Sequence, residues 1–286
     1  MQFTYMIRDP QMLRTFLQEQ GYSKNTISAI KHNGALIVNG QAETVRKQLQ
    51  NGDIVEVHLG YETASNNLIP FNKPLNILYE DAYLLIVSKK AFQNCAPSRE
   101  HKHFSLAEQV LGYFKQSGQN IVPHIVTRID RNTSGIVVIA KHGFLHHLMS
   151  NVHIDKTYLC VCYGELQSQG IIDAPIARDP ASIITRQVNS NGKQAKTKYR
   201  CLDHKNNYSL CEVTLLTGRT HQIRVHLQHI GHPIVGDDLY GGEHSYFKHQ
   251  LLRCFKISFI HPIYDQKIEI QLSLIHISEP TRQEAI

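Results

Sequence analysis

The sequence predicts an α+β protein in which a mixed, mainly antiparallel sheet is flanked by helices and preceded by a small α/β domain. Short runs that alternate apolar and polar residues, as strands do, recur between residues 35 and 271 and are separated by turn residues. Only a few segments have helical spacing, and the polar segment 61–73 has neither pattern. We therefore expect a small domain at 1–60, a linker at 61–73 and a larger domain at 74–271.

The composition is that of an ordinary globular protein with a mild excess of positive charge. The 286 residues include 30 Lys plus Arg against 24 Asp plus Glu, and 42% of the residues are hydrophobic. A formal net charge of +6 permits a polyanionic partner without requiring one. The sequence has no signal-peptide pattern and no apolar run near the ~18 residues that a membrane helix needs. We expect a cytoplasmic monomer.

The cysteines and histidines do not suggest a metal site. The six cysteines show no C-x-x-C spacing and are expected to be reduced core thiols. His226, His229 and His232 recur every three residues, but the chain has no H-E-x-x-H motif and the third histidine lies beyond the expected end of its helix. We therefore expect no bound metal.

The first 60 residues contain two helical patterns followed by two strand patterns. Ser23 can cap the second helix. Residues 35–40 and 52–57 read as short strands with turn residues between them. Lys24 and Lys31 lie in the second helix and could contact phosphate groups, although single lysines are as often simply solvated.

The larger domain alternates strand and helix patterns. Ser105 and Glu108 form a capping box for a helix. Thr220 can cap the last helix, which Gly231 and Pro233 would end. Strand patterns occupy 74–80, 83–88, 156–164, 195–201 and 208–216, and helical spacing recurs at 144–149.

The segment 126–141, V-T-R-I-D-R-N-T-S-G-I-V-V-I-A-K, is expected to form a strand, a tight turn and a second strand. The period of two places Arg128 and Asp130 on one face and turns Ile129 toward the core. Asp130 would then stand at a strand end, beside arginines, where a ligand could reach it. An isolated segment of this kind is more often a salt-bridged strand end with an Asx-type turn.

Three segments together resemble the motifs of the RluA-type pseudouridine synthases. Segment 126–141 resembles H-R-L-D-R-x-T-S-G-L-L-L-x-A-K, with Thr127 in place of the usual histidine. Segment 156–164 resembles K-x-Y-x-A-x-V-x-G, and 215–241 closely matches L-x-T-G-R-x-H-Q-I-R-x-H-L-x-x-x-G-H-P-I-x-G-D-x-x-Y-G. The family's usual N-K-P-x-G reads S-K-K-A-F at 88–92, so this loop is expected to differ. Residues 1–60 resemble the RNA-binding domain shared with ribosomal protein S-four.

The resemblance implies the pseudouridine synthase fold and an isomerase that converts specific uridines of structured RNA to pseudouridine without a cofactor. Asp130 would be the nucleophile, Tyr158 the active-site tyrosine, and Arg224 the arginine that pairs with the aspartate. Arg128 would help to displace the flipped base. Large-subunit ribosomal RNA is the expected substrate and transfer RNA the alternative. Further RNA contacts are expected at Arg131, Arg219, His221, Lys24 and Lys31.

Two other classes of protein remain open at this point. A noncatalytic RNA-binding or ribosome-assembly protein could keep the same scaffold, a reading favoured by Thr127 and the altered loop at 88–92. Convergence of Asp130, Tyr158 and Arg224 in one cleft would discriminate against it. A nucleotide-dependent enzyme is disfavoured because the chain lacks both G-x-x-x-x-G-K-[ST] and G-x-G-x-x-G.

The last fifteen residues, 272–286, do not resemble the family's ending. Their L-S-L-I-H-I-S-E-P-T-R is what a transposase adapter used in preparing sequencing libraries would encode if it were read through in frame. We expect the native sequence to stop near Gln271 and the tail to carry no site residue. The alternative is a natural amphipathic tail.

Overall fold

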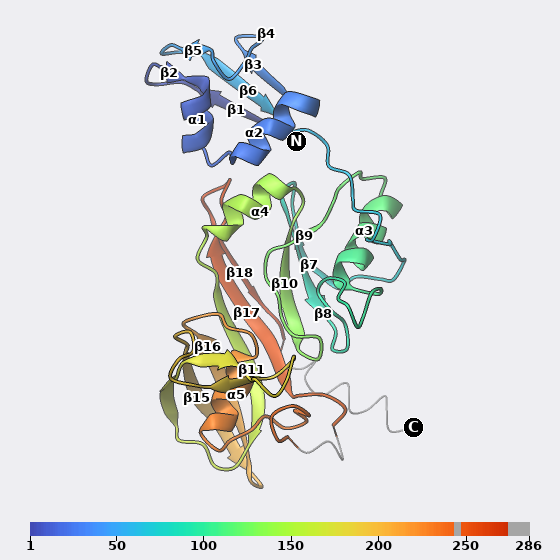
Figure 1. The fold of residues 1–286 in the computed structure, drawn as a ribbon, viewed down its shortest axis with the longest axis vertical. Coiled ribbons are helices and arrows are strands. Elements are labelled where there is room, and N and C mark those ends of the chain that lie inside the picture. The colour runs from blue at the N-terminus through green and yellow to red at the C-terminus, as the bar shows by residue number, and fades with distance from the viewer. Residues whose placement is uncertain (243–246, 274–286) are drawn as a thin grey trace.

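The computed structural model of the protein describes residues 1–242 and 247–273. Figure 1 shows a small N-terminal domain seated on one end of a larger domain, whose strands form one long curved sheet. The elements of the small domain are β1 (Gln2–Met6), β2 (Gln11–Met12), α1 (Leu13–Glu19), α2 (Lys24–Asn33), β3 (Ala35–Val38), β4 (Gln41–Ala42), β5 (Gln48–Leu49) and β6 (Ile54–His58).

The larger domain is built on a ten-stranded sheet, and its only parallel pair among the described strands is β10 with β17. The order is β12-β15-β16-β11-β17-β10-β8-β7, with β18 beside β17 and β9 beside β10. Its elements are β7 (Ile77–Glu80), β8 (Leu84–Lys89), α3 (Leu106–Gln116), β9 (His124–Ile125), β10 (Ser134–Ala140), α4 (Gly143–Ser150), β11 (Asp155–Tyr163), β12 (Gln169–Asp173), β13 (Ile176–Arg178), β14 (Arg186–Val188), β15 (Lys196–Lys205), β16 (Tyr208–Leu215), α5 (Gln222–His229), β17 (Leu252–Ile260) and β18 (Lys267–Gln271). The expected mixed, mainly antiparallel sheet with flanking helices is confirmed.

Strands β8 and β10 bury both faces, which explains their continuous apolar runs at 84–87 and 136–140. Alternate side chains face α3, whose capping box between Ser105 and Glu108 is present as expected. The other face of these strands joins the main core of the protein. The α3 side is packed by Leu85, Val87, Val137 and Ile139 against Leu106, Val110 and Phe114.

The small domain packs on α4 and the end of the sheet through aromatic side chains. Tyr22 stacks on Phe144 with ring centroids 4.3 Å apart, and Phe3 lies 5.4 Å from Phe144 and 5.8 Å from Tyr83. The expected linker has no helix or strand, but Glu62 accepts hydrogen bonds from the Gly143 N–H. The two domains therefore share one continuous apolar core.

Two local predictions are wrong. No strand covers 127–130, because the Thr127 hydroxyl accepts the Val138 N–H at 2.9 Å and takes the place of a backbone carbonyl in the ladder. Thr220 does not cap the last helix, since α5 begins one residue after His221, which stands at the cap with a φ of 57°.

The cysteines are free, and all except Cys201 are buried, as expected for core thiols. None of the described helices is long and apolar enough to cross a membrane. Of the suspected tail, only Leu272 and Ser273 lie within the described residues, and Leu272 is buried with its N–H donated to the Phe255 carbonyl.

Candidate active site

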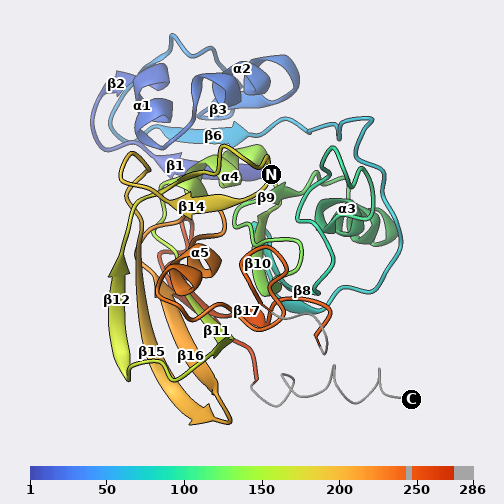
Figure 2. The same ribbon diagram turned by 60° about the horizontal axis from the view of Figure 1, so that its bottom comes forward.

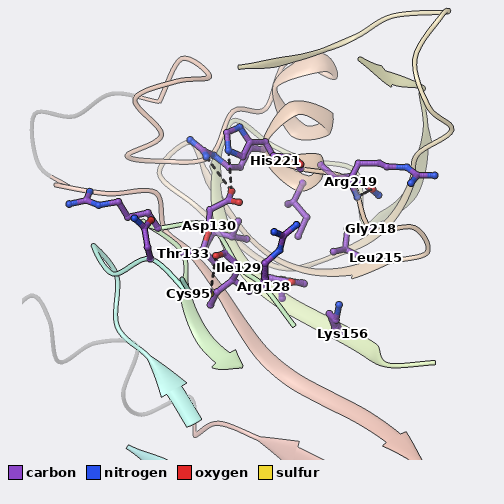
Figure 3. A pocket seen from close by; sticks show the side chains of 18 of the residues that line it. Cys95, Arg128, Ile129, Asp130, Thr133, Lys156, Leu215, Gly218, Arg219 and His221 are labelled. Carbon is purple, nitrogen blue, oxygen red and sulfur yellow. Dashed lines mark hydrogen bonds and ion pairs between the residues drawn. The ribbon is translucent and has the colours of Figure 1, made fainter. Parts of the chain in front are cut away.

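The three residues expected to be catalytic line one cleft of about 620 Å³. Asp130 comes from the loop before β10, Tyr158 from β11 and Arg224 from α5. Figure 3 shows the Asp130 carboxylate projecting toward His221, while Arg128 and Lys156 approach from another side. The convergence that distinguishes a catalytic from a noncatalytic scaffold is therefore present.

Arg224 is held mainly by a carboxylate that the sequence analysis did not assign. Its Nε and Nη2 both donate to Asp237 at 2.7 Å, while its Nη1 donates to Asp130 Oδ2 at 3.2 Å. Asp237 is completely buried, and the Tyr240 ring lies 5.0 Å from the guanidinium carbon. Burial lowers the pKa of Arg224, but the two carboxylates outweigh it and the net pKa is raised. The arginine is thus a fixed cation with one nitrogen directed at Asp130.

Asp130 remains accessible although its loop is firmly held. Its side chain is 28% exposed, and its carboxylate faces Arg224 and, at 3.8 Å, His221 Nε2. The Asp130 carbonyl accepts the Thr133 N–H, and Gln250 donates to the Thr133 hydroxyl at 3.1 Å. A carboxylate that is oriented by a buried cation and open to the cleft can act as a nucleophile.

Gly135 lets the strand after this loop approach its parallel neighbour. Its φ is 116°, and a Cβ there would collide with the backbone of Cys254 on β17. The glycine of the T-S-G sequence is therefore required by the close contact between β10 and β17.

Lys89, at the end of β8, forms hydrogen bonds with two loops of the site, the loop after β8 and the loop that carries Asp130. Its ammonium donates to the carbonyls of Lys90 at 2.9 Å, Gln93 at 2.7 Å and Arg131 at 3.1 Å. Burial lowers its pKa to about 8. Three carbonyl acceptors match the three protons of an ammonium group, so Lys89 fixes the Asp130 loop against the loop after β8.

Tyr158 and His221 complete the inner surface of the cleft. Tyr158 is buried, and burial raises the pKa of its hydroxyl well above the usual value, so the hydroxyl stays protonated. His221 Nδ1 lies 2.8 Å from the Tyr240 hydroxyl, which also accepts the Arg186 N–H. Burial lowers the pKa of His221, which favours a neutral imidazole.

The expected RNA-binding residues fall into two groups. Arg128, Arg131, Arg219 and His221 line the cleft. Lys24 and Lys31 are exposed on α2 of the small domain and lie outside the cleft lining. The three arginines of the first group create a positive rim that suits a polyanionic ligand.

Sequence reasoning missed three residues that organise the site, which are Lys89, Asp237 and Tyr240. Asp237 and Tyr240 lie in the G-D-D-L-Y-G sequence after α5, and Lys89 is the last residue of a strand that begins with four apolar residues. The available signal was that Asp237 and Tyr240 follow Arg224 closely in the sequence. Spacing alone does not show that the chain folds back after α5 and brings these two side chains against the arginine.

No group of His, Cys, Asp or Glu within 1–242 and 247–273 is placed to hold a metal ion. Two of the three histidines that recur every three residues, His226 and His232, are hydrogen-bonded to other groups. His226 is bonded to the Thr197 hydroxyl at 2.8 Å and the Ala174 carbonyl at 2.9 Å, and His232 to the Tyr163 carbonyl at 2.8 Å.

Known proteins resemble this chain in sequence. A family model described as RNA pseudouridylate synthase matches residues 83–229. An uncharacterised RNA pseudouridine synthase of Bacillus subtilis (strain 168) is 37% identical over 92% of this chain and 95% of that protein. Ribosomal large subunit pseudouridine synthase D of Xanthomonas campestris pv. campestris is 33% identical over 86% of this chain and 80% of that protein. The chain therefore belongs to the RNA pseudouridylate synthase family.

Solved structures agree on the fold. Human RNA pseudouridylate synthase domain containing 1 superposes with a TM-score of 0.57 at 23% identity, covering 74% of this chain and 86% of that one. Human RNA pseudouridylate synthase domain containing 4 gives 0.58 at 20% identity, covering 71% and 91%. The predictions of the family, its fold and its enzyme class are confirmed, and RNA is the substrate class.

Proposed function

We propose that the protein converts specific uridines of large-subunit ribosomal RNA to pseudouridine, with Asp130 as the nucleophile. The observation that carries the proposal is the accessible Asp130 carboxylate held by Arg224 in the same cleft as Tyr158. The choice of RNA is supported by relatives named ribosomal large subunit pseudouridine synthase D, which are 33% and 35% identical to this chain. This substrate would place the enzyme in the cytoplasm, and we propose that it acts there as a monomer.

The reaction is an isomerisation that balances without an oxidant or reductant. The bond between uracil N1 and ribose C1′ breaks, a bond between C5 and C1′ forms, C5 loses a proton and N1 gains one. Asp130 would attack either ribose C1′ or the base, and in both cases Arg224 favours the ionised carboxylate that attack requires. Tyr158 offers a ring face to the uracil and a hydroxyl for proton transfer.

The target uridine must leave its stack before it can reach Asp130. This step costs a few kcal/mol, which is about the size of the stacking and phosphate contacts that the cleft can return. Arg128 is exposed at the cleft and could fill the space that the base leaves. Buried Tyr158 would then receive the flipped ring.

The test is Asp130→Asn, assayed by tritium release from RNA labelled at uridine C5 and taken from a strain that lacks the gene. The amide keeps the shape and a hydrogen-bond acceptor for Arg224, so we expect normal folding and RNA affinity with no tritium release. Asp238→Asn is the matched control, since this 45% exposed carboxylate lies 3.8 Å from Arg224. Full release by Asp130→Asn would exclude the nucleophile, and mapping pseudouridines with and without the gene would identify the RNA.

We also propose that the small domain binds RNA through α2. Lys24 and Lys31 are exposed there, and each phosphate contact makes affinity depend on salt. Replacing both with alanine should weaken binding and lower the salt slope by about one per lost contact. Lys115→Ala, on the exposed side of α3, is the control. An unchanged salt slope in the double variant would refute the role of α2.

A further inference from the structure

Phe92 occupies an unusual conformation in the loop that follows β8. Its φ is 62°, in the left-handed region that a bulky side chain avoids, and its side chain is 46% exposed. The loop reads S-K-K-A-F where the family pattern has N-K-P-x-G, so a phenylalanine stands at the position of a glycine. A glycine would adopt this backbone without strain, which makes the aromatic ring the feature that needs an explanation.

The backbone on both sides of Phe92 is fixed by Lys89. The buried ammonium binds the carbonyl of Lys90 before the phenylalanine and that of Gln93 after it. The Gln93 side chain also donates to Gln109 on α3 at 2.7 Å. The strained conformation is therefore imposed by the surrounding structure, as is common at binding sites.

The ring of Phe92 lies beside the catalytic loop. The Arg131 guanidinium carbon is 5.7 Å from the ring centroid, and the His249 ring is 5.2 Å away at 84°. Arg131 follows Asp130 in the sequence and lines the cleft, and Lys89 binds its carbonyl as well. One ammonium thus fixes the aromatic ring relative to the nucleophile.

We propose that Phe92 is a stacking platform for a nucleobase of the substrate RNA that neighbours the target uridine, with Arg131 binding the adjoining phosphate. This proposal rests on the proposed function. Every nucleobase has a π face, and a ring held beside a cation on a positive rim suits an unpaired base of a polyanion. Because the ring is fixed before RNA arrives, stacking would not require the loop to become ordered.

Phe104 provides a matched control within the same chain. It is also a phenylalanine at positive φ, 64°, and its side chain is 72% exposed. Neither phenylalanine lines the cleft itself, but the Phe92 ring contacts Arg131, which does, whereas the Phe104 ring packs edge-on against Phe71 at 5.4 Å. The two positions share backbone strain and exposure but differ in the partner of the ring, which is Arg131 of the cleft for Phe92 and Phe71 for Phe104.

The chain has no tryptophan, so a single introduced indole reports on its own position. We would introduce Phe92→Trp or Phe104→Trp into Asp130→Asn protein and titrate each with total RNA from a strain that lacks the gene. Stacking of a base should quench the fluorescence of the Phe92→Trp protein and leave that of Phe104→Trp unchanged. Filter binding of the same samples would measure RNA affinity separately.

Kinetics in the active enzyme provide the second readout. Phe92→Leu should raise KM for RNA about tenfold with kcat unchanged, and Phe92→Tyr should restore KM. Phe92→Gly should raise KM equally without lowering the urea midpoint, which separates stacking from folding. RNA binding without quenching, equal quenching at both positions, or an unchanged KM for Phe92→Leu would overturn the platform. Failure of the wild-type chain to bind RNA would overturn the proposed function as well.

Discussion

Replacing Arg224 with methionine tests whether the buried ion pair, rather than the bond to Asp130, organises the site. The arginine side chain is 4% exposed and Asp237 is fully buried, with two 2.7 Å bonds between them. Arg224→Met removes the cation and leaves the Asp237 carboxylate, among the described residues, with one backbone donor, the Leu239 N–H at 3.1 Å. Breaking a buried pair from one side costs about 3–5 kcal/mol, which is a third or more of the stability of many proteins.

The loss of stability in Arg224→Met should be partly reversed by removing the unpaired charge of Asp237. In Arg224→Met with Asp237→Asn, the buried carboxylate is gone, so we expect roughly half of the lost free energy of unfolding to return. Asp130→Asn alone should change stability by less than about 0.5 kcal/mol, because its side chain is 28% exposed and can be solvated.

Urea unfolding followed by circular dichroism measures all four proteins, with tritium release as the parallel assay of activity. Both variants that lack Arg224 should be inactive, whatever their stability. The reasoning is refuted if Arg224→Met costs less than about 1 kcal/mol, since a desolvated, unpaired carboxylate cannot be that well tolerated. It is equally refuted if Asp237→Asn makes Arg224→Met still less stable.

Three other variants test the supports of the site. Lys89→Met leaves three buried carbonyls without their donor, so we expect a loss of at least about 1–3 kcal/mol in urea unfolding and reduced tritium release. Burial lowers the pKa of His226, so below about pH 6.5 the unfolded chain binds a proton before the folded chain does. Stability should therefore fall as pH drops through this window, and His226→Gln should flatten the dependence in urea titrations; an unchanged slope would contradict the assignment. Phe144→Ala removes the ring that Tyr22 stacks on and should cost about 3–5 kcal/mol and make 61–76 susceptible to limited proteolysis, whereas exposed Phe104→Ala should not.

The sequence correctly predicted two helix caps that depend only on neighbouring residues. The capping box at Ser105 and the cap at Ser23 form as expected, because each depends on residues three positions apart. The prediction of a strand at 126–130 was wrong for an equally local reason, which the β-branched residues of this segment do not reveal. Threonine favours strands, but at position 127 its hydroxyl replaces a backbone acceptor and ends the ladder.

The site itself could not be derived from spacing. Asp130 and Arg224 are 94 residues apart, and only the resemblance to a family joined them. The role of Asp237 was not predicted because a carboxylate in a glycine-rich segment usually faces solvent. In the structure, the turn after α5 places Asp237 in full burial against Arg224. Likewise, only the last two residues of helix α5 are exposed to solvent, and Arg224 and His226 are buried because partners from other elements form hydrogen bonds with them.

The placement of Asp130 follows from the whole sheet rather than from its own loop. Lys89 reaches the loop from the end of β8, Gln250 from the segment before β17, and Arg224 from α5. Figure 2 shows where β8, β17 and α5 lie in the larger domain. These three elements are brought together only when β8 and β17 pair on either side of β10, and the second pairing needs Gly135 at its start. The carboxylate can therefore stay exposed to substrate while its loop is fixed, because Lys89 and Gln250 bind a carbonyl and a hydroxyl of the loop and Arg224 binds one oxygen of the carboxylate.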